Sequence, residues 1–399
     1  MTSQTNITNT DTMEITEINA YGVNVPLVPF EEGGLAPYVT NHNSLDDMDR
    51  ILVEVKTDDG LSGWGEVRSF LTPEATISVI EDGVQPLVLG QSPFELEKLR
   101  RQVFIEYTNA DMFFAPVEVA CWDIVGKALD EPVYKLLGGW TTPTQTETKH
   151  RSNQGEYDDE KAVEIAYCLG ILSPEKSRER AAEVLESGYS VLKTKAGRDW
   201  KTDVARIKAM HDEVDGELEF RLDPNQGWTT DQAIRVGSSL ADAGIYLQYM
   251  EQPIRVNAHK SLASLKNQTG QPIGPNEDTY IPNNLRRLID AGAIDVAVLD
   301  LTPAGGIAGL RQQAGIVEDA GLPMVHHCAF DLGVRTAAIL HAVYGIPGFS
   351  MPPDSTYYAW EDDVIECEFT VDNGAIEVPE EPGLGIDIDR SRIEEYRIA

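Results

Sequence analysis

The chain has 399 residues, and its 66 acidic residues against 32 basic ones give a formal net charge of −34. A charge of this sign and size repels nucleic acids and anionic membrane surfaces, so we expect neither as a partner. The length is sufficient for two hydrophobic cores, and 42% hydrophobic residues are typical of a folded chain. We therefore interpret the charge as an acidic coat, as on proteins that work at high salt.

The sequence also favours a soluble protein of the cytoplasm. No run of residues approaches the roughly 18 apolar positions of a membrane span, and the polar N-terminus lacks an apolar signal core. The cysteines are far apart and form no C-x-x-C pair, which predicts buried free thiols in a reducing compartment. They are Cys121, Cys168, Cys328 and Cys367.

The first third of the chain, residues 13–139, has the pattern of a small α+β domain. It follows a Thr- and Asn-rich tail at 1–12 that we expect to be disordered. Residues 51–67 alternate in polarity around a turn and predict a β-hairpin, and residues 72–137 follow a helical pattern. A loop at 27–44 contains glycines and is long, and such loops often cover a site.

Residues 140–160 are polar without periodicity and predict a linker or insertion. In residues 161–365, short apolar segments alternate with amphipathic helices, which predicts an α/β fold with a parallel (β/α)7–8 barrel. The strand candidates are 163–169, 189–195, 218–223, 245–251, 272–274, 294–300, 323–327 and 348–351. Strands in the C-terminal piece, 366–399, are expected to return to the first domain.

Helix boundaries support this alternation. Ser173-Pro174 has the pattern of a helix start, with a capping hydroxyl before a proline. Glycines stand at matching helix ends before the next strand. They are Gly188, Gly244, Gly292 and Gly321.

A charged side chain ends six successive strand candidates, with gaps of 28, 28, 26, 23 and 27 residues along the chain. Each gap is the length of one strand, one helix and two short loops. In a (β/α) barrel such residues meet at one mouth, because catalytic groups lie at the C-terminal ends of the strands. These residues are Lys195, Asp223, Glu251, Glu277, Asp300 and His327. No G-x-G-x-x-G follows a first strand, so a dinucleotide-binding fold has no support.

The second barrel strand ends in Lys193-Thr194-Lys195. Side chains alternate along a strand, so both lysines point to the same side. Two adjacent ammonium groups depress each other's pKa, which would prepare one lysine to act as a general base near neutrality.

The next three strands end in Asp223, Glu251 and Glu277. Three carboxylates cannot all stay ionised in a cleft without a cation, and hard oxygen ligands indicate Mg²⁺. The third ligand is open between Glu277 and its neighbour Asn276. We prefer Glu277 because it brings a charge.

Asp300 and His327 end neighbouring strands, so the carboxylate can orient the imidazole and support its protonated form. His326 should face the other side of its strand. A lysine on one side of a divalent metal and a His–Asp dyad on the other suit removal of the proton α to a carboxylate.

Motifs along nearly the whole chain resemble the mandelate racemase/muconate lactonizing group of the enolase superfamily. They are G-W-G-E at 63–66, W-D-I-V-G-K at 122–127, L-L-G-G at 136–139, K-T-K at 193–195, D-P-N-Q at 223–226, M-E-Q-P at 250–253 and the Gly305-Gly306 turn. The resemblance implies a modified TIM barrel capped by the N-terminal α+β domain, whose loop contributes to specificity.

The same resemblance assigns roles by position. It implies Asp223, Glu251 and Glu277 as metal ligands, Lys195 and His327 as the acid/base groups, and Asp300 behind His327. It also implies that Asn225 lies beside metal and substrate, and we assign Asn276 and Lys193 to substrate binding as well. Relatives that racemise mandelate use a glutamate after the eighth strand, and residues 348–354 contain none.

The leading hypothesis is a Mg²⁺-dependent dehydratase of an acid sugar, an aldonate or aldarate, that forms a 2-keto-3-deoxy acid. The alternative is a racemase or epimerase that uses the same two bases on a 2-hydroxy acid. A cycloisomerase is less favoured, because such relatives commonly carry lysines on both sides. A catalytically silent metal-binding protein would have a damaged base or ligand set, whereas all the expected residue types are present. We expect a small carboxylate as substrate and a homo-oligomer as the assembly.

Overall fold

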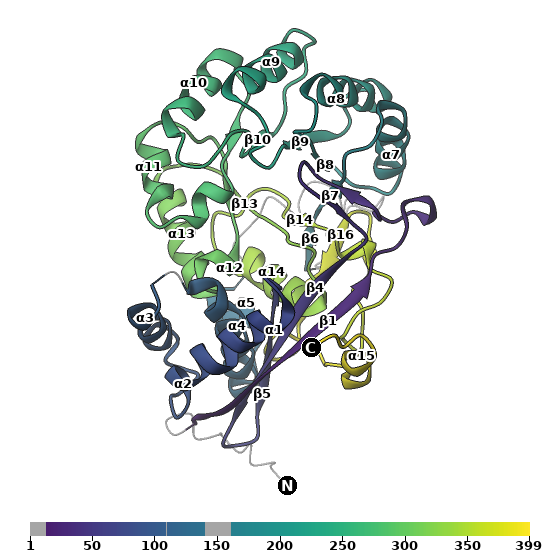
Figure 1. The fold of residues 1–399 in the computed structure, drawn as a ribbon. Helices are drawn as coiled ribbons and strands as arrows, with labels where there is room; N and C mark the ends of the chain where they lie inside the picture. The colour runs from purple at the N-terminus through teal and green to yellow at the C-terminus, as the bar shows by residue number, and fades with distance from the viewer. Residues whose placement is uncertain (1–12, 109, 140–160) are drawn as a thin grey trace, which may run out of the picture.

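The computed structural model describes residues 13–108, 110–139 and 161–399, so the predicted tail at 1–12 and the predicted linker at 140–160 lie outside the described residues. An N-terminal α+β domain lies against a parallel barrel whose helices form its outer ring (Figure 1). Within the described residues, no helix is long and apolar enough to cross a membrane.

The N-terminal domain is built on a three-stranded antiparallel sheet in the order β1-β4-β5. Its strands are β1 (Ile15–Pro26), β4 (Asp47–Thr57) and β5 (Ser62–Arg68). The predicted hairpin is therefore present as β4 and β5. The helices are α1 (Pro73–Ser78), a π-helical turn (Val79–Val84), α2 (Gln85–Val88), α3 (Leu96–Glu106), α4 (Asp111–Leu129) and α5 (Val133–Leu137). The predicted loop contains a 3₁₀ turn (Phe30–Glu32), β2 (Tyr38–Val39) and β3 (Ser44–Leu45).

The glycines of the G-W-G-E hairpin let helix α4 pack directly on strand β5. A Cβ atom at Gly63 would lie 2.0 Å from the carbonyl oxygen of Ala120, and one at Gly65 would lie 1.9 Å from that of Pro116. Any larger residue would push the helix away from the sheet, and the apolar core between them would open.

The barrel strands are parallel and meet in one ring. They are β7 (Ala166–Leu169), β8 (Val191–Lys195), β9 (Glu219–Asp223), β10 (Tyr249–Glu251), β11 (Ile273–Gly274), β12 (Ala297–Leu299), β13 (Met324–His326) and β14 (Asp354–Ser355). Six of them form a sheet in the order β11-β10-β9-β8-β7-β14, and β12 pairs with β13. A backbone hydrogen bond from Val298 N to Pro275 O joins β12 to the residue that follows β11. A parallel β-bridge between Met324 and Phe349 joins β13 to the segment that precedes β14.

Two predicted strands differ from the structure. The first, 163–169, is two strands: β6 (Ala162–Glu164) pairs outside the barrel, and only β7 enters it. The eighth, 348–351, contributes one bridging residue, and the paired strand β14 begins at Asp354. The alternation of apolar residues cannot distinguish a strand of the barrel from a strand that pairs outside it, because the alternation does not specify the partner strand.

The helices cover the outside of the barrel. They are α7 (Pro174–Glu186), α8 (Trp200–Val214), α9 (Thr230–Ala241), α10 (His259–Thr269), a 3₁₀ turn (Glu277–Tyr280), α11 (Asn284–Asp290), α12 (Leu301–Ala304), α13 (Ile307–Asp319) and α14 (Gly333–Gly345). The side chain of Ser173 caps α7, as predicted. The four predicted glycines at helix ends all have positive φ, between 59° and 84°.

The C-terminal segment contacts both parts of the molecule. A 3₁₀ turn (Tyr357–Ala359) precedes β15 (Val371–Asp372) and β16 (Ala375–Glu377). These two strands form a small sheet with β6, just before the chain enters the first barrel strand, β7. After α15 (Arg390–Glu395), Tyr396 and Ala399 accept backbone hydrogen bonds from β1. Cys367 in this segment is exposed, so the prediction that all four thiols are buried is wrong for that residue.

A buried carboxylate joins the two domains. Glu118 of α4 is fully buried and accepts the backbone N–H groups of Ile307 and Ala308 at 2.8 and 2.9 Å, which caps α13 of the barrel. Gly306 precedes them at a φ of 105°, and a Cβ there would lie 2.0 Å from Oε2 of Glu118.

We predict that Gly306→Ala lowers the free energy of unfolding by about 2 kcal/mol or more, because it strains the backbone and displaces Glu118. The matched control is Gly315→Ala, in the middle of the same helix, where a Cβ meets nothing within 4 Å. That change should stabilise the protein by about 0.5 to 1 kcal/mol. Urea unfolding of both variants measures the difference, and equal unfolding midpoints would contradict the domain contact described here.

Candidate active site

A cavity of about 550 Å³ lies where the barrel mouth meets the N-terminal domain. Six of the predicted site residues line it: Lys195, Asn225, Asn276, Glu277, Asp300 and His327. The predicted loop covers it with Tyr38, Thr40, His42 and Asn43, and β4 and β5 contribute Arg50 and Arg68. The structure therefore brings together residues from five barrel strand ends and from the capping domain.

The two lysines of β8 are held by carboxylates. Lys195 lies beside Asp223 in the register of β8 and β9, with Nζ 2.5 Å from Oδ2. Lys193 is buried, with Nζ 2.7 Å from a carboxylate oxygen of both Glu251 and Asp354. Lys193 therefore belongs to the charged floor below the cavity.

This pairing corrects the predicted pKa shift of the lysines. Burial lowers the pKa of Lys195, but the Asp223 carboxylate outweighs burial and the Lys193 charge, so the pKa rises. Burial likewise lowers the pKa of Lys193, and the Asp354 and Glu251 carboxylates raise it well above its usual range. The prediction that mutual repulsion prepares a neutral lysine is wrong here, because each ammonium faces a closer opposite charge.

Asp354 is a site residue that the sequence reasoning missed. It begins β14, is buried, and also accepts a hydrogen bond at 2.8 Å from Arg221 of β9. The spacing along the chain could have identified it. Asp354 follows His327 by 27 residues, and the gaps between the other strand-end residues are 23 to 28 residues. Placing the eighth strand at 348–351 concealed that spacing.

Burial and charge perturb the three predicted metal ligands. Burial would raise the pKa of Asp223, but Lys195 and Lys193 hold it well below its usual range. Burial, followed by the Asp223 charge, raises the pKa of Glu251 well above its usual value and that of Glu277 to a smaller extent. The charges of these carboxylates therefore influence one another's protonation.

The donor set fits a hard divalent ion. In the described residues, no three His, Cys, Asp or Glu side chains are arranged to hold a metal ion, and Asp223 and Glu251 contact lysine ammonium groups. Oε2 of Glu277 is nevertheless buried without a hydrogen-bond partner. Such an oxygen needs a cation or a proton, and a site of carboxylate oxygens suits Mg²⁺.

Asn276 and Glu277 both line the cavity, but their side chains differ in what they already contact. Oδ1 of Asn276 accepts a hydrogen bond from the Tyr280 hydroxyl at 2.8 Å, and its Nδ2 donates to Val298 O at 3.4 Å. Glu277 receives one bond, from Gln226 at 3.2 Å, and keeps its second oxygen free. This difference favours Glu277 as the third ligand.

His327 and Asp300 form the predicted dyad, with Nδ1 3.0 Å from Oδ2. A carboxylate only accepts hydrogen bonds, so Nδ1 carries the proton and Nε2 is left for a substrate. Burial lowers the pKa of His327 in spite of the opposing bond to Asp300, which corrects the prediction of a supported imidazolium. His326 faces away, as predicted, and its Nε2 accepts the backbone N–H of Leu301 at 3.1 Å.

A relay of buried charges extends from the dyad to the capping domain. Arg335 of α14 donates to Asp300 at 2.6 Å and also pairs with Asp331. Arg50 of β4 lies 3.2 Å from Asp331 and 2.7 Å from Glu66 of β5. The sequence reasoning missed this relay, because pattern and spacing do not show which charges become buried together.

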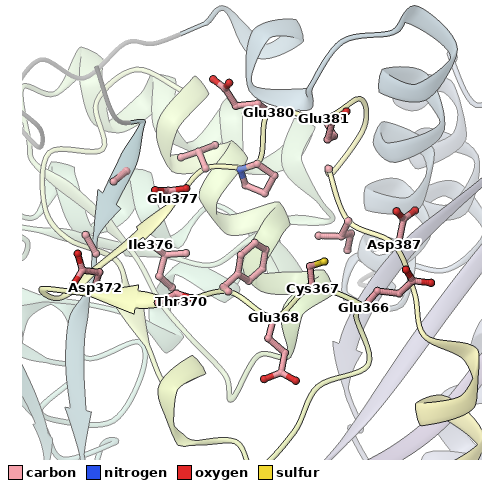
Figure 2. Close-up of a pocket in the computed structure, with 17 residues that line it drawn as sticks. Glu366, Cys367, Glu368, Thr370, Asp372, Ile376, Glu377, Glu380, Glu381 and Asp387 are labelled. Atoms are coloured by element: carbon pink, nitrogen blue, oxygen red, sulfur yellow. The ribbon is translucent and has the colours of Figure 1, made fainter. Parts of the chain in front are cut away.

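A second hollow, of about 620 Å³, lies along the C-terminal segment (Figure 2). Among the described residues, it is bordered by carboxylates and by no lysine, arginine or histidine. The carboxylates belong to Glu366, Glu368, Asp372, Glu377, Glu380, Glu381 and Asp387. None of the predicted site residues lines it, so we place the chemistry at the barrel mouth.

The fold and the cavity define a capped barrel with an acid/base site at the C-terminal ends of its strands. Residues 27–138 match the family described as mandelate racemase / muconate lactonizing enzyme, N-terminal domain, and residues 176–392 match the family described as enolase C-terminal domain-like. The chain therefore belongs to the enolase superfamily, in its mandelate racemase/muconate lactonizing group. Members of this superfamily use Mg²⁺.

Three relatives indicate the range of reactions in this group. The chain is 27% identical over 392 residues to the N-succinyl-L-Arg/Lys racemase of Bacillus cereus, covering 97% of this chain and 98% of that protein. Its solved structure matches with a TM-score of 0.85, at 26% identity and with 97% and 98% of the two chains covered. The arabinonate dehydratase of Saccharolobus solfataricus is 25% identical, with 88% of this chain and 91% of that protein covered.

The third relative is the hydrophobic dipeptide epimerase of Enterococcus faecalis. It is 29% identical over 306 residues, which are 75% of this chain and 80% of that protein. Its structure, complexed with Mg and the dipeptide L-Leu-L-Tyr, matches with a TM-score of 0.82 at 24% identity, covering 94% of this chain and 99% of that chain. The matched proteins thus include racemases, epimerases and dehydratases.

We predict that Glu277→Gln raises the Kd for Mg²⁺ by about tenfold or more, because it removes the charge of one oxygen ligand. Asn276→Ala should change the Kd less, because the Asn276 side chain is already satisfied by protein groups. Calorimetric titration of both variants with MgCl₂ compares them. The reverse ranking would identify Asn276 as the third ligand.

We predict that Arg335→Met lowers the free energy of unfolding by about 3 to 5 kcal/mol, because Asp300 and Asp331 then stay buried with less compensating charge. Arg311→Met is the control, since Arg311 is exposed on α13. Thermal unfolding measures both changes. Comparable melting temperatures for the two variants would show that the relay does not stabilise the fold.

Proposed function

We propose that this protein is a Mg²⁺-dependent dehydratase of an acid sugar, an aldonate or aldarate. It would remove the proton α to the carboxylate and expel the 3-hydroxyl, giving an enol that becomes a 2-keto-3-deoxy acid. The observation that carries the proposal is the His327–Asp300 dyad, whose Nε2 is free in the cavity that Lys195 also lines. The arabinonate dehydratase relative is consistent with an acid-sugar substrate.

The positions of the two acid/base groups suit a substrate held between them. In the ring of barrel strands, β8 with Lys195 and β13 with His327 are separated by four strands in one direction and by two in the other. The two side chains therefore approach a bound substrate from different walls of the cavity. A substrate whose α-carbon lies between them presents its C–H bond to one of them.

His327 is suited to both proton transfers of a dehydration. Its pKa is lowered, so the imidazole is neutral near pH 7 and Nε2 can accept the α-proton. The resulting imidazolium is a stronger acid than an unperturbed one, and it can return that proton to the departing 3-hydroxyl as water. Lys195, whose pKa is raised, stays charged and attracts the substrate carboxylate.

Asp223, Glu251 and Glu277 are the residues that would hold Mg²⁺. When bound, the ion would neutralise these carboxylates and stabilise negative charge on the substrate carboxylate. Asp300 keeps the imidazole of His327 in the tautomer that presents Nε2, and Arg335 holds Asp300 ionised. Phe330, Leu45 and Met48 narrow the cavity with apolar surface, which limits the access of water.

A racemase or epimerase is the second candidate. A neutral His327 and a charged Lys195 on different walls could remove a proton from one face of a carbon and deliver one to the other. The N-succinyl-L-Arg/Lys racemase relative is consistent with this reading. We place dehydration first because His327, whose pKa is lowered, can both accept the α-proton and return it to the leaving hydroxyl, whereas 1,1-proton transfer also needs Lys195, whose raised pKa makes it a weak proton donor.

The test is turnover of a panel of aldonates and aldarates in D₂O with Mg²⁺, with and without a chelator. We expect a 2-keto-3-deoxy acid from at least one member, and no product after chelation. Proton NMR reports both water loss and exchange at C2. Deuterium at C2 without loss of water would support the epimerase, and no product from any acid sugar would end the dehydratase proposal.

We predict that His327→Asn lowers kcat by about a hundredfold or more, the usual contribution of one acid/base group, and that Lys195→Ala lowers kcat/KM by about as much, because the charge that attracts the substrate carboxylate is lost. Both variants should fold, because neither side chain contributes to a hydrophobic core, and Asp223 keeps Lys193 at 3.5 Å. Lys260→Ala on the surface of α10 is the control. A matching loss of thermal stability in both site variants would contradict a purely catalytic role.

A further inference from the structure

Arg68 is the last residue of β5, and its exposed side chain lines the active-site cavity from the capping domain. Its guanidinium lies 5.3 Å from the centre of the Phe70 ring, which orients it without neutralising it. Within the described residues, no carboxylate forms an ion pair with Arg68, although the chain carries 66 acidic residues.

The other lysine and arginine side chains of the cavity are all committed to carboxylates. Lys195 pairs with Asp223, and Arg50 with Glu66. Arg335 pairs with Asp300 and Asp331. Among the described residues of this cavity, Arg68 is therefore the basic side chain that no carboxylate of the protein neutralises. Its charge is available to bind a ligand.

The register of the capping sheet places Arg68 beside an arginine that is already neutralised. Arg68 stands directly opposite Arg50 in the pairing of β4 and β5, so both side chains point to the same face. Arg50 is bonded to Glu66 and Asp331, and among the described residues no carboxylate is bonded to Arg68. Of this opposed pair, Arg68 is therefore the arginine that can take an anionic ligand.

Arg68 is also electrostatically close to the catalytic wall. Burial raises the pKa of Tyr280 well above its usual range, and the charge of Arg68 opposes this rise. The Tyr280 hydroxyl lies 3.5 Å from Nδ1 of His327. An anion on Arg68 would thus occupy the same cavity as the reacting carbon, on the capping side.

We propose that Arg68 binds a second carboxylate of the substrate, so that the substrate is a dicarboxylate whose reacting end lies at Lys195. The proposal deepens the proposed function, and it selects aldarates over aldonates. An N-succinyl amino acid is also a dicarboxylate, and it is the corresponding kind of substrate if the protein is a racemase. A guanidinium and a carboxylate form two parallel charge-assisted hydrogen bonds, which supplies both affinity and orientation.

The experiment compares matched pairs that differ in the second carboxylate. The acid-sugar pair is D-glucarate and D-gluconate, and loss of water is measured for it. The other pair is an N-succinyl and an N-acetyl amino acid, and deuterium exchange at Cα is measured for it. Any pair that is not turned over is titrated directly by calorimetry with Mg²⁺ present. We expect the dicarboxylate of at least one pair to be preferred by about tenfold or more, in kcat/KM or in Kd.

The variant Arg68→Gln should remove that preference. We expect it to lower kcat/KM or affinity for the dicarboxylate by about tenfold or more, mainly through KM, and to leave the monocarboxylate unchanged. Arg101→Gln is the matched control, because Arg101 is exposed on α3 outside the cavity. Neither change should alter the melting temperature by more than a few degrees.

The outcomes separate this proposal from the proposed function. Dehydration of acid sugars without a preference for the dicarboxylate would overturn the role of Arg68 and leave the dehydratase intact. A preference in the N-succinyl pair, together with no product from any acid sugar, would support Arg68 and overturn the dehydratase. An equal effect of Arg68→Gln on both members of each pair, or no preference in any pair, would overturn the second-carboxylate site.

Discussion

The barrel mouth depends on pairing buried charges of opposite sign. Lys193 is almost completely buried, and it is held there by Glu251 and Asp354 from strands on either side of β8. Burying an ammonium alone would be very unfavourable, but the carboxylates offset that cost. The ammonium in turn neutralises carboxylates from two different strands. One set of contacts therefore holds β8, β10 and β14 together at the barrel mouth.

The capping domain and the barrel share this electrostatic design. Glu66 of the capping sheet accepts the backbone N–H groups of Leu332 and Arg335 at 2.9 and 2.8 Å, so it contacts the start of the helix that holds Arg335. Arg335 in turn holds Asp300, and Asp300 orients His327. The tautomer of the His327 imidazole is thus set by a chain of groups that crosses the domain boundary. The cap does more than border the cavity, because it also supports the His327–Asp300 pair.

The sequence predicted the barrel and its strand-end residues, because one βα unit has a nearly constant length and its polar end recurs at that interval. It did not predict Asp354 or Arg335. Asp354 was hidden by a wrong strand position, and Arg335 lies on a helix, where its partners depend on tertiary packing. The pKa of Lys195 was predicted in the wrong direction for a related reason. Spacing shows that two lysines are adjacent, but only the fold shows that Asp223 is nearer.

The division between paired and unpaired charge explains where this cavity can select its substrate. Arg50 and Arg335 are each bonded to two buried carboxylates, and turning either arginine to a ligand would leave those carboxylates unpaired, at a cost of several kcal/mol. Arg50 and Arg335 are therefore fixed parts of the structure. Arg68 of the cap has no carboxylate partner among the described residues, so its charge is available to the far end of a ligand. Under the proposed function, the barrel would supply the chemistry and the cap would select the substrate, because Arg68 is the cavity cation in the described part of the chain that no carboxylate neutralises.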